Sequence, residues 1–476
     1  MIPSGDIAGA AILLTLLSLV LIAGEAWARL GSPSPEKSRK FVHLLSGAAC
    51  LLFPFLIQSP WVVGAMAIAM SSMFAMASKA KIFKSLHSVE RSSRGSEYYP
   101  VAIFLVFLIS ADDLWIYFSA ILTLGVADAF AALIGTRYGR LTFTVQEGKK
   151  SLEGSLAFFL IATAAILLPA PFFTELPWPN LIQIALATAA LLTAFEAISI
   201  RGADNLFVPV AATFILQKLA QEPLTVLVYQ NLHILGLFAL LSATNIGIAY
   251  LLKAERKPFN AGGILTFSLF AFTAWALGSA SWALPVLTGF CLALYAWMAA
   301  SYFIGVQLSI PIRATYRALL MPLVILLFAN FSGDYPLYFG PYLAASAAVA
   351  AFVVTTFWRP DPDRRGPFYS KRFALLAGIA AGFVITLPPF LFHPEIGFLQ
   401  GPLLITLLTA ALAILNLQIV ERRRRRGDEH YWPASHFLLA ITAAALLFAA
   451  QHIGLVDLWQ PPADETLMRY SWQPWW

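Results

Sequence analysis

The chain has 476 residues, of which 59% are hydrophobic and only 12% are charged. A water-soluble protein carries roughly twice that charged fraction, so the composition excludes an ordinary soluble enzyme. The formal net charge of +6 does not indicate a nucleic-acid partner, because the basic residues lie in short loops between apolar stretches. Basic loops of this kind are typical of the cytoplasmic side of membrane proteins.

Apolar stretches long enough to cross a bilayer recur along the whole chain. A transmembrane helix needs about 20 apolar residues, and the stretches 12–28, 61–78, 114–127 and 235–252 approach that length. We count about sixteen candidate spans of this kind. The sequence therefore predicts an all-α, polytopic transmembrane protein.

Lysine and arginine concentrate in every second loop of this predicted topology, as at 29–40, 79–94, 137–150 and 422–426. The intervening loops carry acidic residues, as at 112–113, and almost no basic ones. By the positive-inside rule, the basic loops face the cytoplasm and both termini lie outside. We expect a multi-pass protein of a bacterial inner membrane.

Three acidic residues, Glu25, Asp128 and Glu196, lie late in apolar spans. A charge inside a membrane is costly, so such residues are functional candidates. The same predicted side of the membrane carries further polar residues just beyond the spans: His43, Glu153, Asp204 and Asn205. The polar residues of the N-terminal half thus converge on one membrane face, which we expect to be cytoplasmic.

The segment 125–155 is the richest in chemistry. Small residues follow Asp128 at four-residue spacing, which lets a second helix backbone approach closely. Beyond them come Lys149, Lys150 and Ser151. Ser151 either caps the next helix or begins a helix N-terminus that binds an anion behind two lysines. Carboxylates bind Mg²⁺ and lysines bind phosphates, so a magnesium–nucleotide site is one interpretation, although the phosphate-binding loops of soluble kinases are missing.

Four motifs occur in order within residues 1–220. They are Arg39-Lys40-x-x-His43-x-x-x-Gly47, Gly95-Ser96-Glu97-Tyr98-Tyr99-Pro100, Asp128-x-x-Ala131-x-x-x-Gly135-x-x-x-Gly139-Arg140 with Lys149-Lys150-Ser151-x-Glu153-Gly154-Ser155, and Glu196 followed by Asp204-Asn205 and Pro209. Together they resemble the membrane family of CTP-dependent lipid kinases, which includes dolichol kinase, phytol kinase and CTP-dependent diacylglycerol kinase. Members of this family are often labelled phosphatidate cytidylyltransferase.

The resemblance implies transfer of the γ-phosphoryl group of CTP to a membrane lipid alcohol, with an isoprenoid alcohol favoured over diacylglycerol. It implies Mg²⁺ as cofactor, with three candidate ligands: Asp128, Asp204 and Glu153. It implies catalytic roles for Asp128, His43 and Glu196, the last two to position or deprotonate the alcohol, and a supporting role for Asn205. The nucleotide would be held by a larger set: Arg39, Lys40, Gly135, Gly139, Arg140, Lys149, Lys150, Ser151, Glu153 and Gly154.

Within a second domain of residues 221–476, residues 250–476 faintly resemble the phytyl-phosphate kinase family, around Asn260-x-Gly262-Gly263 and the alanine-rich stretch from Ala344. The acidic motif of that family is missing, because residues 351–357 carry no acid. We predict that this second domain is not catalytic. Two alternatives remain for the whole protein. A cytidylyltransferase acting on a lipid phosphate would use the same site, although its own long signature is missing. A transporter would need acids at mid-membrane and broken helices in corresponding halves.

Overall fold

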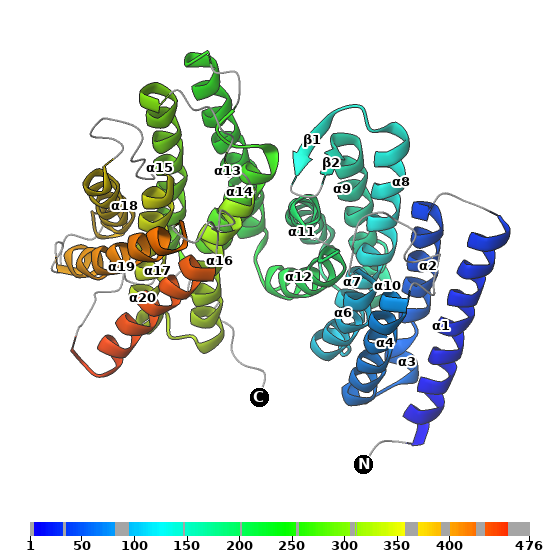
Figure 1. Ribbon diagram of the computed structural model, residues 1–476. Coiled ribbons are helices and arrows are strands. Elements are labelled where there is room, and N and C mark those ends of the chain that lie inside the picture. The colour runs from blue at the N-terminus through cyan, green and yellow to red at the C-terminus, as the bar shows by residue number, and fades with distance from the viewer. Residues whose placement is uncertain are drawn as a thin grey trace. The chain divides into compact units, whose positions relative to one another are not determined.

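The computed structural model describes most of the chain (Figure 1). The described residues are 4–31, 35–80, 95–145, 148–199, 202–253, 257–304, 310, 312–357, 370–391, 400–424 and 434–455. Several basic residues used for the topology prediction, including those within 81–94 and at 201, 359, 364–365 and 425–426, lie outside the described residues. The extreme ends, 1–3 and 456–476, also lie outside them.

The chain forms two compact units, Met1–Leu235 and Gly236–Trp476. The elements of the first unit are α1 (Ser4–Leu30), α2 (Pro35–Cys50), α3 (Phe53–Leu56), α4 (Pro60–Ala80), α6 (Gly95–Ser110), α7 (Leu114–Leu122), the π-helical η1 (Thr123–Ala127), α8 (Asp128–Tyr138), β1 (Thr142–Val145), β2 (Gly148–Ser151), α9 (Leu152–Leu167), α10 (Ala170–Phe173), α11 (Trp178–Ile198) and α12 (Asp204–Leu219). Helix α13 (Leu224–Leu251) crosses the boundary between the units. All four motifs lie in the first unit.

The second unit is built from helices alone within its described residues. They are α14 (Ala261–Gly278), α15 (Ala280–Ile304), α16 (Ile312–Ser332), α17 (Tyr335–Phe357), α18 (Lys371–Leu391), α19 (Gln400–Arg424) and α20 (Ala434–His452). Helix α17 packs against α16, α18 and α20. The side chain of Asn260 caps α14 by accepting a hydrogen bond from the amide of Gly263 at 2.8 Å, which gives this motif residue a structural role.

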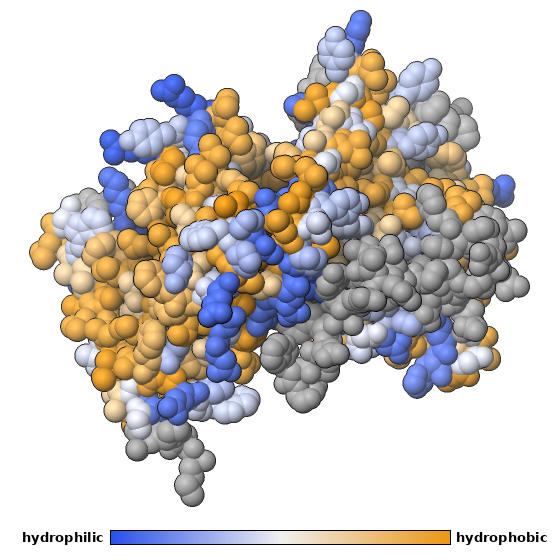
Figure 2. Space-filling model, turned by 180° about the vertical axis from the view of Figure 1, so that it is seen from behind, coloured by the Kyte–Doolittle hydropathy of each residue, from blue (hydrophilic) through white to orange (hydrophobic). Residues whose placement is uncertain are grey.

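The surface of the molecule is suited to lipid. Figure 2 shows hydrophobic residues over much of the visible face, and large apolar side chains such as Trp61 and Ile68 are 74% and 71% exposed. Soluble proteins rarely expose apolar areas of this size. Within the described residues, 12 helices are long and apolar enough to cross a membrane. The protein is therefore an all-α polytopic membrane protein. The number of about sixteen spans and the location of both termini outside remain predictions.

The span that carries Asp128 is longer than its apolar run indicates. The sequence predicts an end near Asp128, but α7, η1 and α8 continue one another from Leu114 to Tyr138. Asp113 caps the start by accepting a hydrogen bond from the Ile116 amide at 3.1 Å. Small residues beyond Asp128 allow the continuation, because α8 packs closely on α9. Asp128 therefore lies inside a helix and not at its end.

Candidate functional site

The π-helical segment η1 changes the hydrogen bonding just before Asp128. In an α-helix the Asp128 amide would donate to the carbonyl of Leu124, four residues earlier. Here it donates to Thr123, five residues earlier. The Leu124 carbonyl instead meets Nε2 of His43, at 2.8 Å. Segments of this kind recur at functional sites, and this one provides an acceptor that holds His43 in place.

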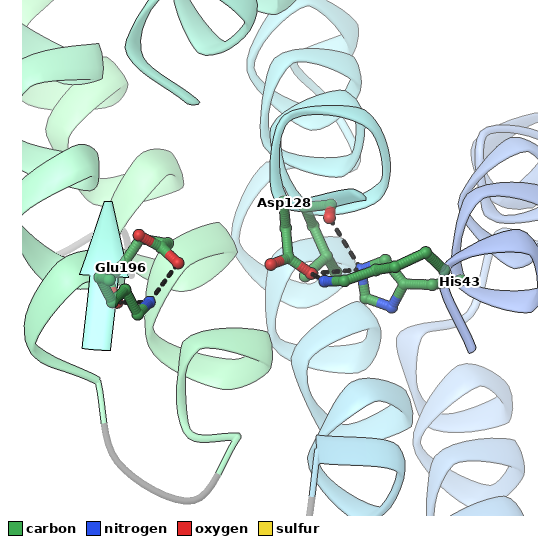
Figure 3. A network of polar contacts seen from close by, with 6 residues as sticks. His43, Asp128 and Glu196 are labelled. Carbon is green, nitrogen blue, oxygen red and sulfur yellow. Dashed lines mark hydrogen bonds and ion pairs between the residues drawn. The ribbon is translucent and has the colours of Figure 1, made fainter. Parts of the chain in front are cut away.

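His43 and Lys40 meet the same carboxylate oxygen of Asp128, and Figure 3 shows the His43 ring beside this carboxylate. Lys40 Nζ lies 2.5 Å and His43 Nε2 lies 3.3 Å from Oδ2 of Asp128. Because a carbonyl and a carboxylate oxygen both accept, we assign the ring hydrogen of neutral His43 to Nε2. Lys40 and Asp128 are only 3% and 7% exposed. A buried charge of either sign needs its partner, so these two residues depend on each other.

Two glycines bring α2 close to this segment. A Cβ atom placed on Gly47 would lie 3.2 Å from the Cα atom of Gly125, so the two backbones touch without side chains between them. The approach lets side chains one and two turns earlier on α2 reach Asp128. The glycine of the first motif is thereby explained by packing.

The hairpin of β1 and β2 brings one lysine into the site. The strands pair antiparallel, with Phe143 opposite Lys150 and Thr144 opposite Lys149. Successive strand residues face opposite sides, and accordingly Lys149 is exposed while Lys150 is partly buried. Lys150 contacts the carboxylate of Glu196 (Figure 3) and donates to its backbone carbonyl at 2.7 Å. Sequence analysis did not distinguish the two lysines.

The charge of Lys150 is maintained by its neighbours. Burial lowers the pKa of an ammonium group. The carboxylates of Glu196 and Asp204 act in the opposite direction and prevail, so the pKa of Lys150 is raised above its ordinary value. Lys150 therefore stays protonated at neutral pH and available to a phosphate.

The glycines after Asp128 serve the packing of α8 on the start of α9. Ser151 caps α9 by accepting a hydrogen bond from the Gly154 amide at 3.2 Å, which confirms the capping interpretation. A Cβ atom on Gly154 would lie 3.1 Å from Cα of Gly135, and one on Gly139 would lie 2.7 Å from Oγ of Ser151. This close fit explains why side chains are missing here. Contact of these residues with a nucleotide stays a prediction.

Glu153 is engaged with the base of the hairpin. Its Oε1 atom accepts hydrogen bonds from the amides of Arg140 and Leu141, at 2.9 and 3.1 Å. These bonds tie the segment between α8 and β1 to the start of α9. As a predicted metal ligand, Glu153 lies outside the carboxylate group that the structure brings together. The structure places Glu196 in that carboxylate group instead of Glu153.

Asp128, Glu196 and Asp204 form what we call the carboxylate cluster. One ligand oxygen from each lies within 4.8 Å of the others. Asp204 is the first residue of α12, and its Oδ1 atom has no hydrogen-bond partner among the described residues. Burial and the Asp128 carboxylate raise the pKa of Asp204. Three converging carboxylates, one of which carries an unsatisfied oxygen, fit a hard divalent cation such as Mg²⁺.

The remaining predicted residues surround this cluster. Asn205 is buried next to Asp204. Arg39 lies close enough to act electrostatically on Asp204. Sequence analysis did not find the Leu124 carbonyl, because a backbone group has no signature in the sequence. It also assigned no role to Tyr99 of the second motif, whose ring meets that of His43 edge-on with centroids 4.9 Å apart.

Comparison with known proteins places the chain in a family. No protein-family model matches it, and no solved structure matches it. The chain is similar to a phytol kinase of Synechocystis sp., with 30% identity over 205 residues, which cover 42% of this chain and 87% of that kinase. More than half of this chain therefore lies outside the match. The chain belongs to the family of lipid kinases that includes this phytol kinase.

Proposed function

We propose that the protein transfers the γ-phosphoryl group of CTP to the hydroxyl group of an isoprenoid alcohol of the phytol or polyprenol kind. The observation that carries the proposal is the carboxylate cluster with Lys40 and Lys150 beside it, within a chain of the lipid kinase family. Isoprenoid alcohols are favoured because the relative is named a phytol kinase. CTP is favoured by the motif resemblance.

Asp128, Glu196 and Asp204 would hold Mg²⁺, since the cluster offers the oxygen ligands that this ion prefers. The ion supplies charge neutralisation to the phosphate oxygens of the nucleotide. Glu153 is left to anchor the hairpin. This assignment exchanges the predicted ligand Glu153 for Glu196.

Lys40 and Lys150 are the cations best placed for the phosphates. Both lie against the cluster, and each contacts a carboxylate that a divalent cation would also attract. When a nucleotide arrives with its negative phosphates, the two ammonium groups would exchange part of their carboxylate contact for phosphate oxygens. Phosphoryl transfer depends mainly on such positioning and charge stabilisation. Arg39, Arg140 and Lys149 would extend the positive surface towards the rest of the nucleotide.

In the reaction, the alcohol oxygen forms a bond to the γ-phosphorus, and the bond from that phosphorus to the bridging oxygen breaks. The products are the lipid phosphate and CDP, and the alcohol proton passes to a base. Glu196 is occupied by Lys150, whereas Nδ1 of neutral His43 keeps its lone pair when Nε2 carries the hydrogen. His43 is therefore the better candidate to orient the alcohol and accept its proton.

The site would face the cytoplasm, where CTP is available. The first turns of α2 carry Lys37, Arg39 and Lys40, and the end of α8 carries Arg137. These basic ends belong to loops that the positive-inside rule assigns to the cytoplasm. A bacterial inner membrane accommodates this arrangement. The second unit, which contributes no member of the cluster, would support or gate access to the lipid.

The test is a product analysis with purified protein in lipid nanodiscs. CTP, ATP and GTP are each supplied with Mg²⁺ and with phytol, geranylgeraniol, a polyprenol, diacylglycerol or phosphatidate. We expect CDP and an alkyl monophosphate, with CTP preferred and with no product from an Asp204→Asn control. Release of pyrophosphate with a CDP-lipid from phosphatidate would replace the kinase by a cytidylyltransferase. No transfer to any acceptor would overturn the proposal.

A further inference from the structure

The hydroxyl group of Tyr99 is buried without a hydrogen-bond partner among the described residues. Its oxygen is inaccessible to solvent and makes no hydrogen bond with the described residues, although the residue as a whole is partly exposed. A buried hydroxyl that forms no hydrogen bond is unfavourable. An unpaired group of this kind beside a candidate active site fits a ligand that supplies the missing partner.

The surroundings of Tyr99 place this hydroxyl next to His43. The two rings meet edge-on at a centroid distance of 4.9 Å and an interplanar angle of 70°. On the α2 side, a Cβ atom on Gly47 would lie 3.5 Å from the Tyr99 hydroxyl. Gly47 follows His43 by four residues, which is about 6 Å along a helix. The hydroxyl thus lies beyond His43, on the side away from Lys40.

This direction along α2 runs from the charged end of the helix into its apolar part. The helix begins with basic residues and ends with Ala48, Ala49 and the buried Cys50, and residues Lys37–Leu56 form a candidate membrane span. A lipid alcohol keeps its chain in the apolar region and presents a single hydroxyl to the polar site. Coming from the membrane, that hydroxyl would reach Tyr99 and His43 before the carboxylate cluster.

We propose that the Tyr99 hydroxyl forms a hydrogen bond with the hydroxyl of a long-chain primary alcohol and so positions its oxygen beside His43. The inference rests on the proposed function and adds a substrate-positioning residue to it. A phenol both donates and accepts, so it can bind the alcohol before and after its proton is lost. Gly47 adds no side chain beside this hydroxyl, where a Cβ atom would lie 3.5 Å from its oxygen.

The substitution Tyr99→Phe removes the oxygen alone, and Tyr98→Phe is the matched control on the same helix. Because the Tyr99 hydroxyl has no partner within the described structure, its loss should leave the melting temperature of the ligand-free protein equal or higher. The KM for phytol should rise about three- to tenfold, the effect of one neutral hydrogen bond. The KM for CTP should not change. Tyr98→Phe should match the wild type in all three quantities.

A binding measurement without nucleotide separates this inference from the kinase proposal. Stabilisation of the wild type by phytol should exceed that by phytane, the hydrocarbon without the hydroxyl, and the difference should shrink in Tyr99→Phe. If the wild type phosphorylates no alcohol and shows no preference for phytol, the proposed function fails and this inference fails with it. If the wild type is an active kinase but Tyr99→Phe keeps the phytol KM and the phytol preference, only the role of Tyr99 is overturned. A lower melting temperature with both KM values unchanged would make the hydroxyl structural, which also overturns it.

Discussion

Removal of Lys40 should destabilise the protein more than removal of its partner Asp128. The carboxylate cluster has three acids, and two lysines, Lys40 and Lys150, lie against it. Lys40→Met would leave three acids facing one lysine. Asp128→Asn would leave two acids facing two lysines, a balanced group in which Lys40 still has Asp204 nearby. The electrostatic consequences of the two substitutions are therefore unequal.

The size of the difference follows from the burial of the pair. Breaking a buried ion pair from one side costs about 3–5 kcal/mol, and we expect Lys40→Met to fall in that range. Asp128→Asn should cost only about 1–2 kcal/mol, since it also relieves repulsion among the acids. The double substitution should cost less than the sum of the two, because the residues are in contact.

Thermal unfolding of the detergent-solubilised variants, recorded once with a chelator and once with Mg²⁺, measures the difference in stability between Lys40→Met and Asp128→Asn. A divalent cation neutralises excess carboxylate charge, so it should restore more stability to Lys40→Met than to Asp128→Asn. Both variants should lose transferase activity by well over tenfold. If Asp128→Asn proves as destabilising as Lys40→Met in the chelator, the charge inventory of the cluster is wrong.

Further substitutions test other parts of the structure. In denaturant unfolding, Gly139→Ala should destabilise the protein by about 1–3 kcal/mol, because its Cβ atom would clash with the neighbouring backbone. Its control Gly236→Ala, which has open space around the Cβ position, should stay within about 1 kcal/mol of the wild type. Glu153→Gln should leave the Mg²⁺ dependence of activity unchanged, and a large rise in the Mg²⁺ requirement would return Glu153 to the metal ligands. Asn260→Ala should cost about 1 kcal/mol of stability through loss of a helix cap and change kcat less than about threefold; a well-folded but inactive variant would place catalytic groups in the second unit. A cysteine at Ser96, after replacement of the exposed native cysteine, should resist an impermeant thiol reagent in intact cells and react in opened cells, and labelling from outside would invert the topology.

Composition and the apolar stretches were sufficient to predict an all-α membrane protein, because hydrophobicity along a helix is a local property of the sequence. The same reasoning indicated that Asp128, Glu196 and Asp204 lie on one membrane face. It could not tell which side chains touch, since that depends on how each helix is rotated about its axis. Lys40 and Asp128 are 88 residues apart, and no local pattern links them.

Two local features, the end of the helix that carries Asp128 and the β1–β2 hairpin, were not predicted correctly from the sequence. The apolar run ends near Asp128, yet the helix continues, because packing against α9 replaces lipid contact as the stabilising interaction. The hairpin of β1 and β2 was missed, although Thr142–Val145 is rich in residues that favour strands. Recognising those strands would have separated Lys149 from Lys150 by the alternation of side chains.

The extra residue in η1 also determines how α8 is rotated about the helix axis relative to α7. Each added residue turns everything beyond it by roughly 100°, so the faces of α7 and α8 are out of step with a single continuous helix. Deleting one residue from Thr123–Ala127 would restore a regular helix and swing the Asp128 carboxylate away from Lys40 while barely altering hydropathy. Among related sequences, length in this stretch should accordingly vary less than amino-acid identity does. Insertion or deletion of one residue here would reduce activity more than many substitutions at the surrounding apolar positions.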